Sequence, residues 1–171
     1  MSFFPGPFPG PPTGPSPGGR SHIPRARVDP ILCADDALAL ITLVIHQPLV
    51  DETVIIALDR SSRGSVVNVV RHARHHDLCT TLETFGAVAG FERATDLERS
   101  ADLEVAAGLV VATVRPRGAT RPDDIDEWLD ASALAESWGL VLFEWFVVGP
   151  AGIECPRDLI GEPERWWPLA S

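Results

Sequence analysis

The stretch LVVATVRPRGATRPDDID, residues 109–126, decides the fold of this chain. Its apolar, β-branched first part, residues 109–114, predicts a buried strand. The strand is expected to end before Pro116, and a loop through Gly118 then leads to an acidic helix that begins at Asp123. A strand, a loop and a helix in this order place a candidate site at the carboxyl end of the strand, where α/β folds commonly carry their chemistry.

The composition predicts one globular domain behind a tail. A chain of 171 residues with 45% hydrophobic side chains can bury one core, so a second domain is not expected. Residues 1–29 are dominated by proline and glycine, which predicts a disordered tail, and the domain is expected to span residues 30–171. Phe3, Phe4 and Phe8 could anchor a partner, but a plain solubilising tail is the favoured interpretation.

Charge and cysteine usage indicate a cytoplasmic protein that binds neither nucleic acid nor membranes. The formal charge of −10 repels phosphate backbones, and no apolar run approaches the roughly 20 residues that a membrane-spanning helix needs. Cys33, Cys79 and Cys155 are widely spaced, which fits reduced thiols, and none has the local signature of an activated nucleophile. All fourteen cationic side chains are arginine, as is typical of bacterial, high-GC, actinobacterial-like coding sequences.

Hydrophobic periodicity along the rest of the chain predicts the order α-β-β-α-β-α-β-β. The fold class is α/β (α+β), a mixed curved sheet of about five strands flanked by helices. The expected elements are a helix over 34–45, hairpin strands at 53–59 and 65–70, a helix over 78–89 with Asp77 as its N-cap, a strand at 108–114, a helix over 123–138, a strand over 139–148, a short strand at 153–155 and one short helix within 156–168.

The second and third helices are each expected to bury one apolar face. In the second helix this face holds Leu78, Leu82, Phe85, Val88 and Ala89. In the third helix it holds Ile125, Trp128, Leu129 and Ala133, with Ser132 beside them. Near the end of the chain, Trp166 and Trp167 are expected to pack back onto the domain.

The central strand, loop and helix resemble the corresponding segment of RadC-like members of the JAB/MPN (JAMM) metalloprotease-like superfamily. Members carry a motif of the form H-x-H-P-x6-S-x-x-D at the end of an apolar strand, and here the same frame runs from Thr113 to Asp126. Residues 106–111 (AAGLVV) and 139–149 (GLVLFEWFVVG) are similar to flanking strands of the family, and residues 58–63 (LDRSSR) are similar to its hairpin. The resemblance implies a single JAB/MPN-like domain.

The same resemblance implies a zinc site, and this chain departs from it at the ligands. Such a site needs two histidines and a carboxylate around the metal, and a glutamate that takes a proton from the bound water. These positions are held here by Thr113 and Arg115 for the histidines, Asn68 or Val67 for the glutamate, Asp123 for a small hydroxyl residue near the helix start, and Asp126 for the carboxylate. One carboxylate does not hold a catalytic zinc. We therefore expect a catalytically inactive, metal-free domain without a cofactor, which acts as a protein-interaction or scaffold module.

Arg115 places a positive charge where the metal would otherwise lie. If the frame is kept, its guanidinium would pair with Asp126 at the start of the following helix. The alternative is that Arg115 points into solvent. A protein partner is expected, and a homodimer is one option.

An enzyme is the rival interpretation. His72, His76 and Asp77 could hold a displaced metal for a hydrolase, and Cys79 extends the same helical spacing. These residues fall at a junction between a strand and a helix, so solvated loop histidines are the favoured interpretation. A DNA-repair accessory role is suggested only by the family name and is disfavoured by the negative charge.

Overall fold

The computed structural model describes residues 23–25, 27–71, 77–91 and 106–166. The elements in this part are α1 (Ala34–Val44), β1 (Glu52–Asp59), β2 (Gly64–Arg71), α2 (Leu78–Ala89), β3 (Ala106–Val114), α3 (Asp124–Ser137), β4 (Val141–Gly149), β5 (Gly152–Glu154) and the 3-10 helix η1 (Pro156–Ile160). The predicted order of helices and strands is confirmed, and so is the mixed α/β fold class.

The five strands form one mixed sheet in the order β2-β1-β3-β4-β5. β1 runs antiparallel to both β2 and β3, and β5 runs antiparallel to β4. β3 and β4 are parallel, so the chain must cross over between them, and α3 makes that crossover. The carboxyl end of β3 and the first turn of α3 therefore lie close together in the fold.

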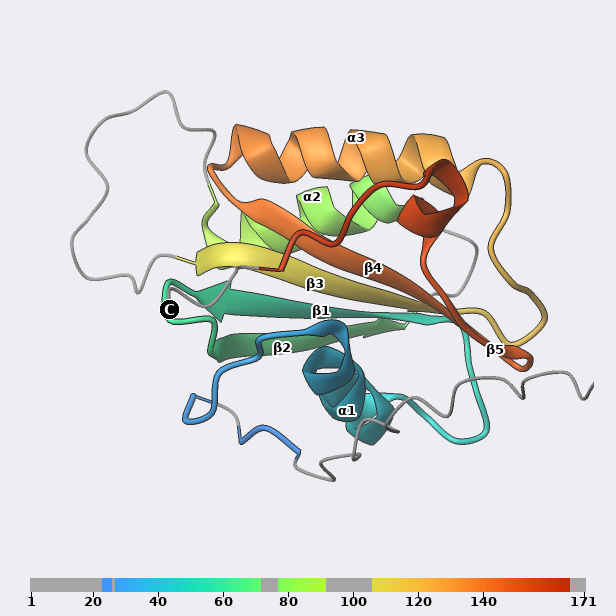
Figure 1. Ribbon diagram of the computed structural model, residues 1–171, viewed down its shortest axis with the longest axis horizontal. Helices are drawn as coiled ribbons and strands as arrows, with labels where there is room; N and C mark the ends of the chain where they lie inside the picture. The colour runs from blue at the N-terminus through green and yellow to red at the C-terminus, as the bar shows by residue number, and fades with distance from the viewer. Residues whose placement is uncertain (1–22, 26, 72–76, 92–105, 167–171) are drawn as a thin grey trace, which may run out of the picture.

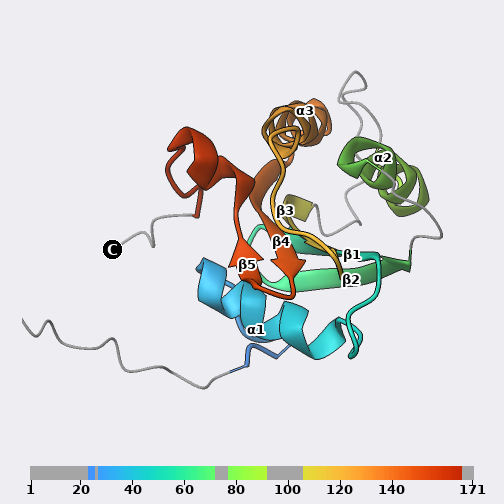
Figure 2. The same cartoon turned by 90° about the vertical axis from the view of Figure 1, so that its right-hand side faces the viewer.

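Helices cover both faces of the sheet, as Figures 1 and 2 show from two directions. α2 and α3 lie on one face, and α1 lies on the other. β1 is buried along most of its length, and β4 is too, because each strand contributes side chains to the core on both faces. This explains why their sequences are nearly continuous apolar runs rather than alternating ones.

α3 presents a face to the core that matches the predicted one only in part, because Trp128 and Ser132 are buried as expected but other predicted residues are not. Its buried residues include Asp124, Trp128, Ala131 and Ala135, which are spaced along one helical stripe. Leu129, predicted to be buried, is 49% exposed, and Ala133 is exposed as well. Trp128 is fully buried and fixes the rotation of the helix. The prediction was therefore right about Trp128 and wrong about Leu129 and Ala133.

α2 also departs from the prediction at one position, because Val88 is 81% exposed. Leu78, Leu82 and Phe85 are buried as predicted, and Gly86 faces inward beside them. A Cβ atom at Gly86 would lie only 2.8 Å from the indole ring of Trp138, so a glycine lets α2 approach that ring closely. Asp77 caps the helix as predicted, accepting a hydrogen bond from the Thr80 backbone N–H.

The described chain begins to pack a few residues before the predicted domain boundary at residue 30. The Arg27 backbone N–H donates to the Gly64 carbonyl at 3.2 Å. At the other end, Trp166 stacks on Phe143 with ring centroids 5.5 Å apart, as expected, whereas Trp167 lies outside the described residues. Phe3, Phe4 and Phe8 lie outside them too.

No helix in the described part of the chain is long and apolar enough to cross a membrane.

Candidate functional site

The end of β3 carries Arg115, and the loop after it is held against β4. The Arg115 backbone N–H donates to the Val148 carbonyl at 2.8 Å, which continues the parallel pairing by one residue. A Cβ atom at Gly149 would lie 2.1 Å from the Gly118 carbonyl oxygen, so only a glycine allows the loop to pass this closely. This contact turns the loop back toward the start of α3.

The Arg115 side chain is buried and forms a two-point ion pair with Asp124. The guanidinium Nη1 donates to Asp124 Oδ2 and Nη2 donates to Oδ1, both at 2.6 Å, and the side chains are only 5% and 1% exposed. Nη1 also donates to the Ala119 carbonyl, and the Arg121 backbone N–H donates to Asp124 Oδ2. Such parallel pairing is the strongest arrangement of arginine and carboxylate.

The prediction that Arg115 pairs with Asp126 is therefore wrong in its partner. Asp126 is exposed, two residues beyond Asp124 on α3. Two residues correspond to about 200° of rotation around a helix, so the two carboxylates point to opposite sides. Asp123, where the helix was predicted to begin, occupies the N-cap position, and its side chain makes no capping hydrogen bond.

Sequence reasoning missed Asp124, although a signal for it exists. Asp124 precedes Trp128 by four residues and Ala131 by seven, so all three fall on one stripe of α3. An acidic residue on the core stripe, at the first turn of a helix that follows an arginine-containing loop, indicates a buried ion pair.

Thr113, which stands at the other position where the resemblance implies a histidine, uses its side chain in a hydrogen bond. Its hydroxyl accepts a hydrogen bond from Trp145 Nε1 at 2.9 Å. Asn68 lies on the edge strand β2, opposite Ile55 of β1, and Ile55 in turn lies opposite Val111 of β3. A whole strand thus separates Asn68 from Thr113.

The structure therefore brings together only part of the predicted set. Thr113 and Arg115 belong to one end of β3, and Arg115 meets Asp124. Asn68, Asp123 and Asp126 do not join them.

The alternative metal ligands are not tested as a group. His72 and His76 lie outside the described residues. The Asp77 carboxylate accepts hydrogen bonds from the backbone N–H and the hydroxyl of Thr80, so it serves the start of α2. Among the described residues, no three His, Cys, Asp or Glu side chains are grouped so that they could hold a metal ion.

The thiols of Cys79 and Cys155 are poorly suited to nucleophilic chemistry. Burial, with added repulsion from Asp130 and other nearby carboxylates, raises the pKa of Cys79 to about 11. Burial, with added repulsion from Glu144, raises the pKa of Cys155 to about 12. Both thiols are protonated at neutral pH and lack the thiolate that attacks substrates.

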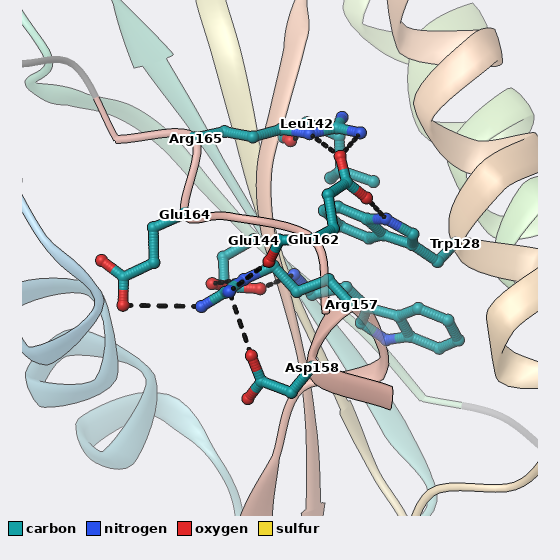
Figure 3. A network of polar contacts seen from close by, with 9 residues as sticks. Trp128, Leu142, Glu144, Arg157, Asp158, Glu162, Glu164 and Arg165 are labelled. Atoms are coloured by element: carbon teal, nitrogen blue, oxygen red, sulfur yellow. Dashed lines mark hydrogen bonds and ion pairs between the residues drawn. The ribbon is translucent and has the colours of Figure 1, made fainter. Parts of the chain in front are cut away.

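A second buried ion pair holds the C-terminal segment, and the sequence reasoning did not predict it (Figure 3). Arg157 Nε donates to Glu144 Oε2 at 2.7 Å, and the Glu144 side chain is fully buried in β4. Glu162 accepts from Trp128 Nε1 at 2.6 Å and pairs with Arg165. A lone glutamate within the apolar run GLVLFEWFVV is a signal for such a buried partner.

A third polar cluster lies at the open end of the β1–β2 hairpin, away from its turn. Glu52, fully buried, accepts from the His46 backbone N–H at 2.7 Å and lies 2.6 Å from His46 Nδ1. Arg71 contacts His46 Nε2. Since a guanidinium can only donate, Nε2 accepts, and Nδ1 carries the proton toward Glu52.

A surface pocket of about 350 Å³ adjoins this cluster. Its lining residues in the described part of the chain are His46, Gln47, Pro48, Val50, Asp51 and Arg71. They include no hydroxyl or thiol nucleophile for His46 to activate. In this arrangement Glu52 orients His46, and His46 holds the Arg71 side chain at the end of β2.

No protein-family model matches this chain, and no curated protein matches it either.

Proposed function

We propose that this chain is a catalytically inactive, metal-free JAB/MPN-like (RadC-like) domain that acts as a protein-interaction or scaffold module. The observation that carries the proposal is the ion pair between Arg115 and Asp124. At the place where the resemblance implies a zinc ion, a guanidinium supplies the positive charge instead. It pairs with a carboxylate from the first turn of the following helix.

The electrostatics of this pair support an interaction role over a hydrolytic one. A zinc ion at the end of β3 would face the Arg115 guanidinium at close range, and burial would strengthen their repulsion. Both Asp124 oxygens are already bonded, and the Thr113 hydroxyl accepts from Trp145. The arrangement can stabilise the joint between β3 and α3, but it offers no group that would activate water.

We further propose that the protein works in the cytoplasm with its thiols reduced and without a cofactor. Cys33, Cys79 and Cys155 are all free, which supports a reducing compartment. Nucleic acid is not the proposed partner because the chain carries a formal charge of −10.

Metal analysis of the purified full chain tests this proposal. After incubation with zinc and dialysis, elemental analysis should find far less than one zinc ion per chain. One zinc ion per chain that is lost in the His72→Ala, His76→Ala double variant would overturn the proposal in favour of a displaced hydrolase site. Tight duplex DNA binding that persists at physiological salt would contradict the choice of partner class.

A further inference from the structure

The two edges of the sheet are treated differently. Along the β4 edge, β5 pairs with residues 147–149, and the C-terminal segment covers part of the remainder. Arg165 Nη1 donates to the Leu142 carbonyl at 3.4 Å, and Trp166 stacks on Phe143 of the same strand. Proteins commonly protect an open edge in this way because its free backbone groups pair with other chains.

The β2 edge has much less cover in the described part of the chain. There β2 pairs with β1 only, and the segment before α1 reaches just its first residues, through the Arg27 to Gly64 hydrogen bond and a bridge between Pro30 and Arg63. Residues 66–71 continue beyond this segment. Val66 and Val67 within them are 46% and 41% exposed. Six residues of strand present an edge about 20 Å long.

Positive charge flanks this edge although the whole chain is acidic. Arg71 is the last residue of this stretch, Arg63 lies just before β2, and both side chains are exposed. The nearby Asp59 Oδ1 accepts hydrogen bonds from the backbone N–H groups of Ser61 and Arg63 within the turn. His46 holds Arg71 in place from the other side.

We infer that residues 66–71 of β2 are a docking edge for an extended, acidic segment of a partner protein. The segment adds to the sheet as a sixth strand, with main-chain hydrogen bonds to β2 and apolar side chains against Val66 and Val67. Carboxylates at its two ends pair with Arg63 and Arg71. This inference rests on the proposed interaction role and names the surface and the partner chemistry for it.

Charge also disfavours a second copy of the chain in the register that pairs the whole of β2 with itself. Two β2 strands paired antiparallel about the point between Val67 and Asn68 would place Arg71 opposite Gly64 of the other copy. Arg71 would then lie beside the other copy's Arg63, and this clash would occur twice across the two-fold axis. Like charges this close destabilise strand pairs, whereas an acidic strand removes the clash.

Backbone amide NMR of the ¹⁵N-labelled full chain tests the inference with synthetic peptides. The probe is a capped peptide of sequence EVTVTVTVE, whose two glutamates are as far apart in sequence as Arg63 and Arg71, and the matched peptide is KVTVTVTVK. The acidic peptide should shift amide signals within residues 63–71 and bind about tenfold more tightly than the basic one. Equal binding of both peptides, or shifts outside this stretch, would overturn the inference.

Two substitutions with the same charge change make the test specific. Arg63→Glu should weaken the acidic peptide about tenfold, whereas Arg117→Glu, an exposed change in the loop after β3, should leave its affinity unchanged. Arg71→Gln should weaken it as well. An equal loss in both glutamate variants would mean that net charge alone drives binding, which overturns the inference.

Two further outcomes separate this inference from the proposed function. A dimer by sedimentation equilibrium that dissociates in Val67→Lys, which adds a further positive charge to the edge, would assign the edge to a second copy and overturn the acidic partner. Peptide binding that fails in a chain without zinc would overturn only the docking edge. Metal analysis that finds one zinc ion per chain would overturn the proposed function. The docking edge would then stand or fall with the peptide-binding result alone.

Discussion

Arg115 and Asp124 join the end of β3 to the first turn of α3 through two parallel hydrogen bonds of 2.6 Å. The pair is nearly sealed from solvent, so each partner depends on the other to offset the loss of hydration. The pair thereby ties the end of the strand to the start of the helix.

Removing either partner of this pair should be costly. Arg115→Ala leaves the Asp124 carboxylate buried with only the Arg121 backbone N–H, and unfolding free energy should fall by about 3–5 kcal/mol. Asp126→Asn, on the exposed side of the same turn, should change it by less than about 0.5 kcal/mol. Urea denaturation of both variants measures the difference. Equal effects would show that the buried pair does not anchor the joint.

The Glu144 and Arg157 pair should behave in the same way at the C-terminal segment. Arg157→Ala leaves Glu144 buried without its cation, so we expect a loss of about 3–5 kcal/mol. Asp158→Asn changes only one of the two exposed partners of Arg157, the other being Glu164, and should cost less than about 1 kcal/mol. Replacing both buried partners by Glu144→Leu and Arg157→Met should recover much of the loss. Thermal melting that ranks Asp158→Asn with Arg157→Ala would contradict this account.

Glu162 should make the fold sensitive to acid. Burial opposes its ionisation, but hydrogen bonds from Trp128 and Arg165 prevail and lower its pKa below the ordinary value of 4.5. Because the folded pKa is the lower one, these bonds stabilise the fold above about pH 4.5 and are lost as the pH falls through the folded pKa.

The melting temperature of the wild type should therefore drop more steeply between about pH 6 and pH 3 than that of Glu162→Gln. Glu136→Gln removes an exposed carboxylate near the end of α3. It serves as the control and should follow the wild type. Identical slopes in the wild type and Glu162→Gln would show that Glu162 gains nothing from its two donors.

The three thiols should differ in their reactivity. Cys33 is exposed, whereas Cys79 and Cys155 are partly buried with pKa values raised to about 11 and about 12. Iodoacetamide at pH 8 should alkylate Cys33 first and the other two only slowly, as peptide mass spectrometry would reveal. Rapid alkylation of Cys155 in the folded chain would contradict the burial described for it.

Hydrophobic periodicity predicted the helices and strands because each of them is held in the fold mainly by burying apolar side chains. It could not rank the carboxylates at the start of α3, since Asp123, Asp124 and Asp126 differ only in the direction in which the helix turns them. Trp128 fixes that direction by filling the core, and the contacts that bury it come from residues distant in the sequence. The Arg115 partner therefore depends on tertiary packing rather than on motif spacing.

The Glu144 network escaped prediction for a related reason. Its cation, Arg157, lies thirteen residues further along the chain, after a turn and the short strand β5. No local pattern joins the two residues. What the sequence does reveal is a charge within a buried strand, which requires a partner without naming it.

Zinc titration of a variant with two introduced histidines tests the central proposal, that Arg115 lies at the position where the family resemblance implies a zinc ion. Thr113 and Arg115 are two residues apart at the end of β3, and Asp124 faces Arg115 from α3. Calorimetry on the folded Thr113→His, Arg115→His variant should detect one zinc ion per chain. Binding should be lost on adding Asp124→Asn and kept on adding Asp126→Asn, and the wild type should bind none. Stoichiometric zinc in the wild type, or none in the folded variant, would contradict the account.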